Sequence, residues 1–137
     1  MEDCVFCKIG EKKLNSYIVF ETHNFISFLD INPLTPGHAV VIPKFHIQNF
    51  IGLEEKFGEE FVKIIKETIL KISKAMNTKD FTIGINDGKL SGRAIDHLHI
   101  HIIPRYKEDK GGSIHSIVHY SSGESLESIY NKIKNES

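Results

Sequence analysis

The chain has 137 residues, 40% of them apolar and 26% charged, which is the composition of an ordinary globular protein rather than a disordered or fibrous one. Its formal net charge of −1 provides no bulk attraction to a polyanion, so we expect no long nucleic acid as a partner. No stretch approaches the roughly 20 apolar residues of a membrane span and none resembles a signal peptide, so we expect a cytoplasmic protein without a membrane partner.

The first half of the chain contains three predicted strands. Runs rich in β-branched and aromatic residues at 16–21 and 25–29, with polar residues between them, predict a hairpin. The prolines and glycine within 32–37 predict a turn. After this turn, residues 38–42 are expected to form a buried strand that Pro43 stops.

The second half of the chain contains the one long predicted helix. Apolar residues recur every three or four positions over 53–76, as in an amphipathic helix. Alternation over 81–85 predicts a strand that ends in the turn Asn86-Asp87-Gly88. We expect a last strand at 95–103 and a short C-terminal helix at 125–133.

This order of elements favours an α+β fold. Its hairpin and single long helix predict a mainly antiparallel five-stranded sheet rather than a doubly wound parallel one. No repeat or linker divides the chain, so we expect a single domain over residues 1–137 in which distant motifs share one core.

Histidines occupy every second position from His97 to His101. In a strand, His97, His99 and His101 would line one face, and the intervening apolar residues would line the core face. Three such imidazoles need partners or a function. The alternatives are a solvated strand face, a zinc site with an open position, and phosphoryl chemistry in which neutral imidazole attacks phosphorus.

The two arginines of the chain, Arg93 and Arg105, flank this run. A guanidinium group offers a planar fork of donors that suits phosphate oxygens, which favours the phosphoryl alternative. Two ordinary surface arginines would give the same pattern.

The run from His97 to Ile103 resembles the mark of the histidine-triad (HIT) family, His-φ-His-φ-His-φ-φ, in which φ is apolar. Further similarity extends over most of the chain up to about Lys107, including the segments 6–9, 28–33, 36–38 and 42–46. The resemblance implies a HIT-like nucleotide-binding domain that usually dimerises and that transfers or hydrolyses a nucleotide at its α-phosphate. A homodimer and a purine nucleotide are therefore the expected partners.

The resemblance also implies roles for single residues. His99 would be the nucleophile and His101 would donate to a non-bridging phosphate oxygen. His38 would lie near the phosphate, which Asn86 would help to orient. Asp30 would accept both ribose hydroxyls. Apolar side chains would sandwich the base, with core packing as the alternative for each: Val5, Phe6, Ile9, Phe28, Ile31 and Val40.

The expected reaction is hydrolysis through a covalent nucleotidyl-histidine that water cleaves to release a nucleoside monophosphate. Many family members carry Gly-Gln-Ser or Gly-Gln-Thr where this chain has Gly92-Arg93-Ala94. Ala94 lacks the hydroxyl proposed to protonate an amine leaving group, and Arg93 would neutralise a polyphosphate. Dinucleoside polyphosphates are therefore favoured modestly over nucleoside phosphoramidates. The alternatives are a non-enzymatic nucleotide-binding module and a nucleotidyltransferase or phosphorylase that uses the same histidine.

The chain has two cysteines, in the pair Cys4-x-x-Cys7. Such a pair alone is as often a redox pair, or no site at all, as it is a metal site. Together with His46 and His97 these cysteines resemble the structural zinc site of bacterial-type HIT proteins, so the expected cofactor is zinc. Asp96 receives no assigned role.

Overall fold

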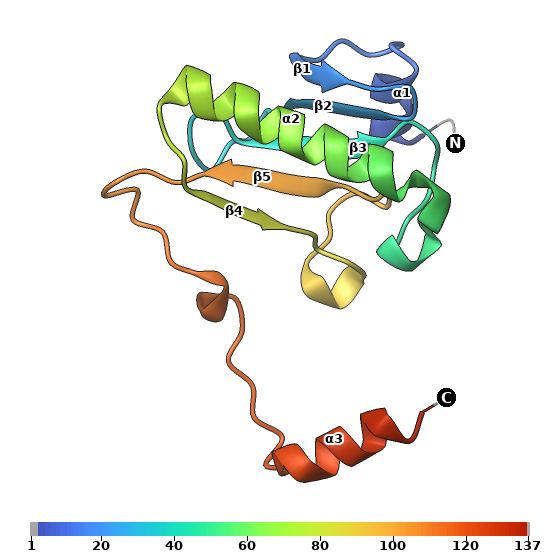
Figure 1. Ribbon diagram of the computed structural model, residues 1–137, viewed down its shortest axis with the longest axis vertical. Coiled ribbons are helices and arrows are strands. Elements are labelled where there is room, and N and C mark those ends of the chain that lie inside the picture. Colours follow the sequence, from blue (N-terminus) through green and yellow to red (C-terminus); the bar gives the residue numbers. More distant parts are fainter. Residues whose placement is uncertain (1–2, 137) are drawn as a thin grey trace.

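A five-stranded antiparallel sheet forms the body of the protein, of which the computed structural model describes residues 3–136 (Figure 1). Its strands lie in the order β1-β2-β3-β5-β4. They are β1 (Ile18–Glu21), β2 (Phe25–Leu29), β3 (Ala39–Pro43), β4 (Phe81–Gly84) and β5 (Ile100–Pro104). The helices are α1 (Val5–Gly10), α2 (Gly58–Met76) and α3 (Leu126–Lys134). The predicted α+β fold with its antiparallel sheet, long helix and short C-terminal helix is confirmed.

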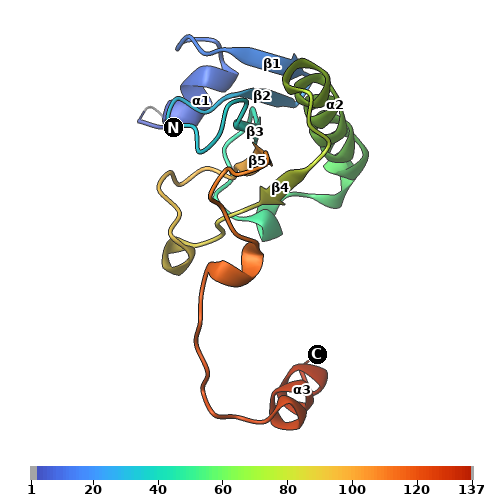
Figure 2. The same ribbon diagram turned by 90° about the vertical axis from the view of Figure 1, so that its left-hand side faces the viewer.

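The sheet separates two apolar clusters because side chains alternate along β2 and β3. On one face Phe25, Val41 and Ile102 pack with Ile64 of α2. On the other face Phe6 and Ile9 of α1 pack with alternate residues of β2 and β3, such as Phe28. Figure 2 shows α1 and α2 on opposite sides of the strands. The chain thus has a thick core under α2 and a thinner apolar layer under α1.

Helix α2 is shorter than the sequence predicts. It begins at Gly58, and residues 50–52 and 55–57 form single turns of 3-10 helix before it. Leu53 and Phe57 still pack against the α2 core, which explains why their spacing continues the apolar period of the helix. The C-terminal end is as predicted, because Asn77 takes a left-handed conformation (φ 55°) and its N–H caps the Ser73 carbonyl.

The prediction that the last strand begins at residue 95 is wrong. Strand β5 starts at Ile100, and the segment before it is irregular because the Leu98 N–H donates to the Ile47 carbonyl (2.7 Å) instead of to a neighbouring strand. The alternation predicted for the segment nevertheless holds. Leu98, Ile100 and Ile102 all lie in the α2 core, and the histidines face the other side of the sheet.

Two smaller differences concern β3 and the N-terminus. Strand β3 includes Pro43, which pairs with Phe25, so this proline lies inside the strand and does not stop it. Helix α1 has no counterpart among the predicted elements. It has six residues, too few for an apolar period to show, and the Cys4 sulfur caps it by accepting from the Cys7 N–H (3.4 Å).

After β5 the chain leaves the body as an extended arm that ends in α3 (Figures 1 and 2). The Arg105 side chain holds the start of this arm, since its guanidinium donates to Asp109, to the Thr82 hydroxyl (2.9 Å) and to the Gly112 carbonyl (2.7 Å). Within residues 3–136, no helix combines the length and the apolar character needed to cross a membrane.

Candidate active site and metal centre

The geometry around His99 leaves one ring nitrogen available as a base. His99 is buried, with 6% of its surface exposed, and its Nδ1 lies 2.7 Å from the His97 carbonyl oxygen. A carbonyl only accepts, so Nδ1 carries the proton and Nε2 keeps its lone pair. The Phe6 ring packs edge-on against the imidazole (centroids 5.1 Å apart) and restricts its rotation. The structure thus holds the His99 ring in one orientation, with Nδ1 engaged by the backbone and Nε2 free of protein hydrogen bonds.

His38 and His101 form a second chain of hydrogen bonds. The Leu34 N–H donates to His38 Nδ1 (3.1 Å), so the His38 proton is on Nε2. That Nε2 donates to His101 Nδ1 (2.9 Å), which leaves the His101 proton on its own Nε2. Burial lowers the pKa of His38, and burial with the nearby His99 and His38 lowers the pKa of His101 to about 4. Both rings are therefore neutral at pH 7, and His101 offers an N–H donor beside His99 (ring centroids 5.1 Å apart).

Asp30 lies at the end of β2, next to this chain. One carboxylate oxygen is 3.6 Å from His38 Nε2, and the other accepts from the Asn32 N–H (2.9 Å). The carboxylate is partly exposed and faces the candidate site, so it retains acceptor capacity for a ligand hydroxyl. Its position is compatible with the predicted contact to ribose.

The predicted base-binding residues divide into two groups. Phe6, Ile9 and Phe28 are buried and pack together beside His99, with the two phenyl centroids 5.6 Å apart. Val5 and Ile31 are exposed, 43% and 85% respectively. Val40 belongs to the buried cluster, as its alternative role in core packing implied. The buried group forms an apolar wall, and the exposed pair remains accessible to a ligand.

Asn86 follows β4 at the edge of this site. Within the β4–β5 pairing, Ile83 is opposite Ile102 and Gly84 is opposite His101. The pairing ends there, and Asn86 lies two residues beyond Gly84 in the loop that leads back to His99. Its contact with a phosphate stays a prediction.

The four predicted metal ligands come together. Cys4 Sγ lies 3.3 Å and Cys7 Sγ 3.5 Å from His97 Nδ1, and Cys7 Sγ lies 3.3 Å from His46 Nδ1. A tetrahedral zinc with bonds of about 2.3 Å to sulfur and about 2.1 Å to nitrogen holds such atoms roughly 3.6 Å apart. His97 Nε2 donates to the Pro43 carbonyl (2.8 Å), so the His97 Nδ1 lone pair faces the sulfurs. The donor set and the tautomer fit a structural zinc ion.

The protonation state of the candidate metal ligands Cys7 and His97 bears on how a metal ion would bind. Burial and the adjacent Cys4 raise the pKa of Cys7 to about 11, so this thiol is protonated at neutral pH when no metal is bound. Burial lowers the pKa of His97 to about 4, which keeps its imidazole neutral and able to ligate. Metal binding would therefore release a proton from Cys7 but not from His97.

Asp30, His38 and His101 also lie within ligand distance of one another. Their tautomers argue against a metal there. His38 Nδ1 accepts from a backbone N–H, so the Nε2 atom that faces the cluster carries the proton and has no lone pair for a metal. This group is better explained as a hydrogen-bond relay.

The Arg93 side chain donates to none of the three triad histidines and bonds to other residues instead. Its guanidinium donates to the Gln48 carbonyl (2.9 Å) and the Asn49 side chain (2.7 Å), and it pairs with Asp96 (3.1 Å). The role predicted for Arg93 on a polyphosphate therefore has no support from its contacts. Asp96, which had no assigned role, is its ion-pair partner.

Backbone groups decide several of these features, and the sequence does not predict where these groups point. The Leu34 N–H and the carbonyls of Pro43 and His97 fix the tautomers of three imidazoles. A turn that contains prolines and a strand that ends in Pro43 are the only signals in the sequence that such groups are present.

Comparison with known proteins decides the family. The model of the HIT domain matches residues 11–108. The chain belongs to the HIT domain family. An uncharacterised HIT-like protein of Borreliella burgdorferi is 44% identical over 118 residues, 82% of each chain. The adenosine 5'-monophosphoramidase HNT1 of Saccharomyces cerevisiae is 34% identical over 108 residues, 79% of this chain and 66% of the yeast protein.

Solved structures agree with the HIT assignment. A member of the HIT family from Bacillus subtilis superimposes with a TM-score of 0.83 and 29% identity, over 98% of both chains. This coverage includes α3 and the part of the arm after residue 108, which lie beyond the residues that the HIT domain model matches.

Proposed function

We propose that this HIT protein hydrolyses nucleotide derivatives at the α-phosphate through a covalent intermediate on His99. The observation that carries the proposal is the pair of tautomers in the triad. His99 presents a lone pair on Nε2, and the neighbouring His101 presents an N–H, which are the nucleophile and the oxyanion donor that displacement at phosphorus requires.

In the first step His99 Nε2 forms a bond to the α-phosphorus and the bond to the leaving group breaks. The His101 N–H donates to a non-bridging oxygen and stabilises the charge that develops there. In the second step water forms a P–O bond, the P–Nε2 bond breaks, and the proton of water passes to solvent. The product is a nucleoside monophosphate, and His99 returns to its neutral state.

The nucleotide half of the substrate would be a ribonucleotide, preferably a purine one. Asp30 offers carboxylate oxygens to the ribose hydroxyls, and the apolar wall of Phe6, Ile9 and Phe28 faces the same side. Contact with a flat apolar surface reads few features of a base, so we expect weak discrimination among purines.

The leaving group of the substrate is less well determined than its nucleotide half. The yeast relative named a phosphoramidase supports an amine leaving group, whereas Ala94 lacks a hydroxyl that would protonate an amine. A phosphate leaving group needs less acid assistance. The substrate class is therefore a nucleoside monophosphate linked to an amine or to further phosphates.

The first test is intact-protein mass spectrometry after rapid quenching with adenosine phosphoramidate and, in parallel, diadenosine tetraphosphate. We expect an adenylyl adduct on the wild-type chain and release of AMP. Labelled phosphate added to the reaction separates the alternatives, since a phosphorylase would incorporate it into product. An absence of both adduct and turnover with every nucleotide tried would instead favour a nucleotide-binding module.

The cluster of Cys4, Cys7, His46 and His97 would bind zinc as a structural cofactor, as in the bacterial branch that the sequence resembles. Its donor set and distances support this assignment. The ion would hold two thiolates beside His97 and tie α1 to the sheet.

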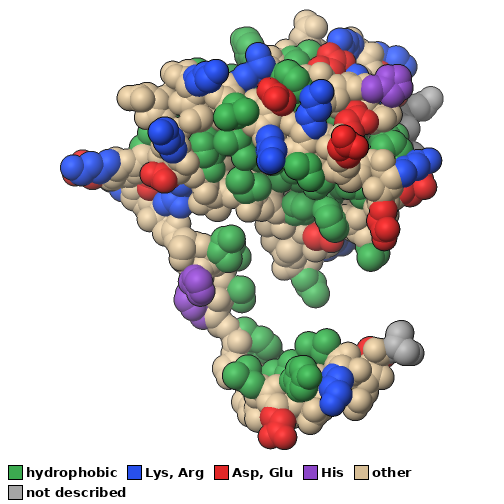
Figure 3. All heavy atoms as spheres, viewed as in Figure 1, with side chains coloured by type: hydrophobic (Ala, Val, Ile, Leu, Met, Phe, Trp, Pro, Cys, Tyr) green, Lys and Arg blue, Asp and Glu red, His purple; other side chains and the backbone are tan. Residues whose placement is uncertain are grey.

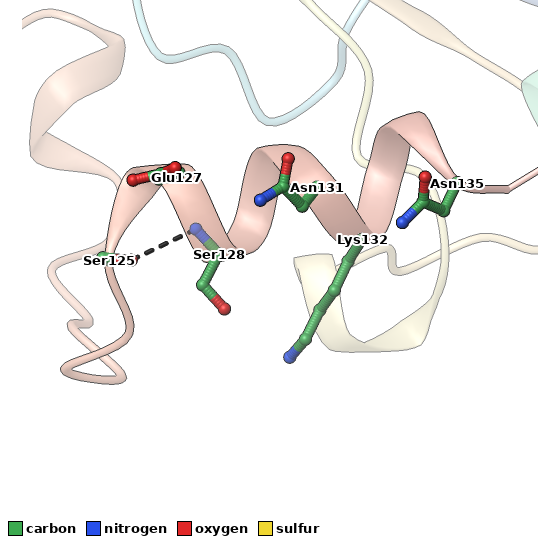
Figure 4. A pocket seen from close by; sticks show the side chains of 6 residues that line it. All are labelled: Ser125, Glu127, Ser128, Asn131, Lys132 and Asn135. Atoms are coloured by element: carbon green, nitrogen blue, oxygen red, sulfur yellow. Dashed lines mark hydrogen bonds between the residues drawn. The ribbon is translucent and has the colours of Figure 1, made fainter.

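The protein would act as a homodimer, and the C-terminal arm supports this proposal. Helix α3 has nine residues, which is too short to be stable alone in water. Its polar face carries the residues that Figure 4 shows, among them Ser125, which caps Ser128. Apolar side chains gather along the arm and on the side of α3 toward the body (Figure 3). They are exposed in a single chain: Ile114, Ile117, Val118, Tyr120, Leu126, Tyr130 and Ile133.

We expect wild-type protein to have twice the protomer mass in light scattering. The double variant Leu126→Ser/Tyr130→Ser should weaken dimerisation by about a hundredfold, roughly 3 kcal/mol, because both side chains would lose apolar contacts with the second copy. Lys132→Ala, on the polar face of the same helix, is the matched control and should leave the mass unchanged. A wild type that stays monomeric at every concentration would contradict the proposal.

A further inference from the structure

The loop between β4 and β5, residues 85–99, is fastened to the segment 47–50 at three points. Near its start, the Asp87 carboxylate accepts from the Phe50 N–H (3.2 Å). Near its end, the Leu98 N–H donates to the Ile47 carbonyl (2.7 Å). The third point is Arg93, which lies between these two in the sequence and whose side chain contacts two residues of the segment, Gln48 and Asn49. This loop carries Asn86, the metal ligand His97 and the nucleophile.

Arg93 is built into the protein rather than displayed on its surface. Its side chain is only 6% exposed. One Nη atom donates to the Gln48 carbonyl (2.9 Å) and to Asn49 Oδ1 (2.7 Å), and the other lies 3.1 Å from Asp96 Oδ1. Its Nε is buried and finds no acceptor within residues 3–136. A guanidinium stays charged at any physiological pH, and burying a charge costs free energy. The two acceptors and the Asp96 carboxylate offset this cost for Arg93.

The Arg93 contact with Asp96 lies one residue before His97, whose carbonyl orients the candidate nucleophile His99. Asp96 precedes His97, and the His97 carbonyl accepts the Nδ1 proton of His99 (2.7 Å). On the other side, Gln48 lies two residues after the candidate metal ligand His46. Arg93 therefore bridges the backbone that follows one candidate metal ligand and the backbone that precedes the other.

We propose that Arg93 is a positioning residue for His99, an inference that rests on the proposed function. By locking residues 93–98 against 47–50, it sets the direction of the His97 carbonyl and so keeps the proton of His99 on Nδ1 and the lone pair on Nε2. The planar fork is essential, because a lysine carries its charge at a single nitrogen and a glutamine has one amide, and neither can meet all three acceptors at these distances.

The test compares Arg93→Lys and Arg93→Gln with the wild type on two substrates that differ in leaving-group charge, adenosine phosphoramidate and diadenosine tetraphosphate. We expect kcat to fall by about tenfold for both variants and both substrates, because a nucleophile displaced by a fraction of an ångström reacts much more slowly. We expect KM to stay within about twofold of the wild-type value. If Arg93 instead binds the polyphosphate, KM will rise for diadenosine tetraphosphate alone and lysine will largely restore it, which overturns the inference.

A readout without turnover keeps the inference separate from the proposed function. Nitrogen-15 NMR of the histidine side chains should show His99 as the Nδ1–H tautomer in the wild type and as a mixture in Arg93→Gln, with faster amide exchange over 94–99. Unchanged tautomer and exchange would overturn the role of Arg93, whether or not the protein is an enzyme. If the arginine variants do not fold, Asp96→Ala removes the exposed carboxylate that pairs with Arg93, and we expect a twofold to threefold lower kcat at constant KM. An unchanged kcat for that variant would likewise overturn it. A wild type without turnover, together with the expected tautomers, refutes the proposed function alone.

Discussion

Replacing His99 with alanine is expected to lower kcat by at least about a thousandfold, roughly 4 kcal/mol of transition-state stabilisation. The reason is geometric. His99 Nδ1 donates to the His97 carbonyl, so the lone pair on His99 Nε2 is free. The lone pair of the neighbouring His101, on Nδ1, already accepts from the His38 N–H. His101 is therefore no substitute for the missing nucleophile. The measurement is single-turnover kinetics with either candidate substrate.

The matched control is His99→Asn. An asparagine amide can donate to the His97 carbonyl as Nδ1–H does, but it offers no nucleophile at the position of Nε2. We therefore expect His99→Asn to melt closer to the wild type than His99→Ala does, with the same loss of kcat and no adenylyl adduct. If either variant retains more than about a tenth of the wild-type rate, a loss of only ~1.4 kcal/mol, the assignment of the nucleophile is wrong.

The parts of the fold that the sequence predicts are those in which burial repeats with a regular period. Leu98, Ile100 and Ile102 alternate with histidines, and they enter the α2 core even though the strand begins only at Ile100. Alternation reports which face a side chain occupies, not which backbone group it pairs with. The bond from the Leu98 N–H to the Ile47 carbonyl joins segments far apart in the chain, so no local pattern could reveal where the strand starts.

The sequence predicts which residue types form the candidate site, but not which ring nitrogens carry protons or which groups each side chain contacts. The family resemblance named the triad, Asp30 and the four metal ligands. The proton positions that give His99 and His101 different roles come from the backbone groups of Leu34 and His97, which the side-chain pattern does not encode. Arg93 shows the converse case. Its residue type suited a phosphate, but neighbouring acceptors from residues 48 and 49 surround it in the fold.

Protein purified without chelator is expected to contain one zinc ion per chain, and Cys7→Ser is expected to lose it. Helix α1 has only six residues and is anchored by Phe6 and Ile9 and by the candidate metal ligands, so loss of a bound ion should release much of its packing on the sheet. We expect the free energy of unfolding to fall by about 3 kcal/mol and the melting temperature by roughly 10 °C. Metal analysis and calorimetry provide these values.

His23 provides the control for this prediction, since it is an exposed histidine outside the cluster and His23→Ser should keep both zinc and stability. Cobalt offers a second readout, because a tetrahedral site with two thiolates gives an intense visible spectrum that the Cys7→Ser variant should lack. Zinc loss should also lower kcat, because His97 is both a candidate ligand and the residue whose carbonyl orients His99. A wild type without metal would show that the cluster is a thiol–imidazole contact and not a zinc site. A Cys7→Ser variant that melts with the wild type would show that the cluster does not stabilise α1.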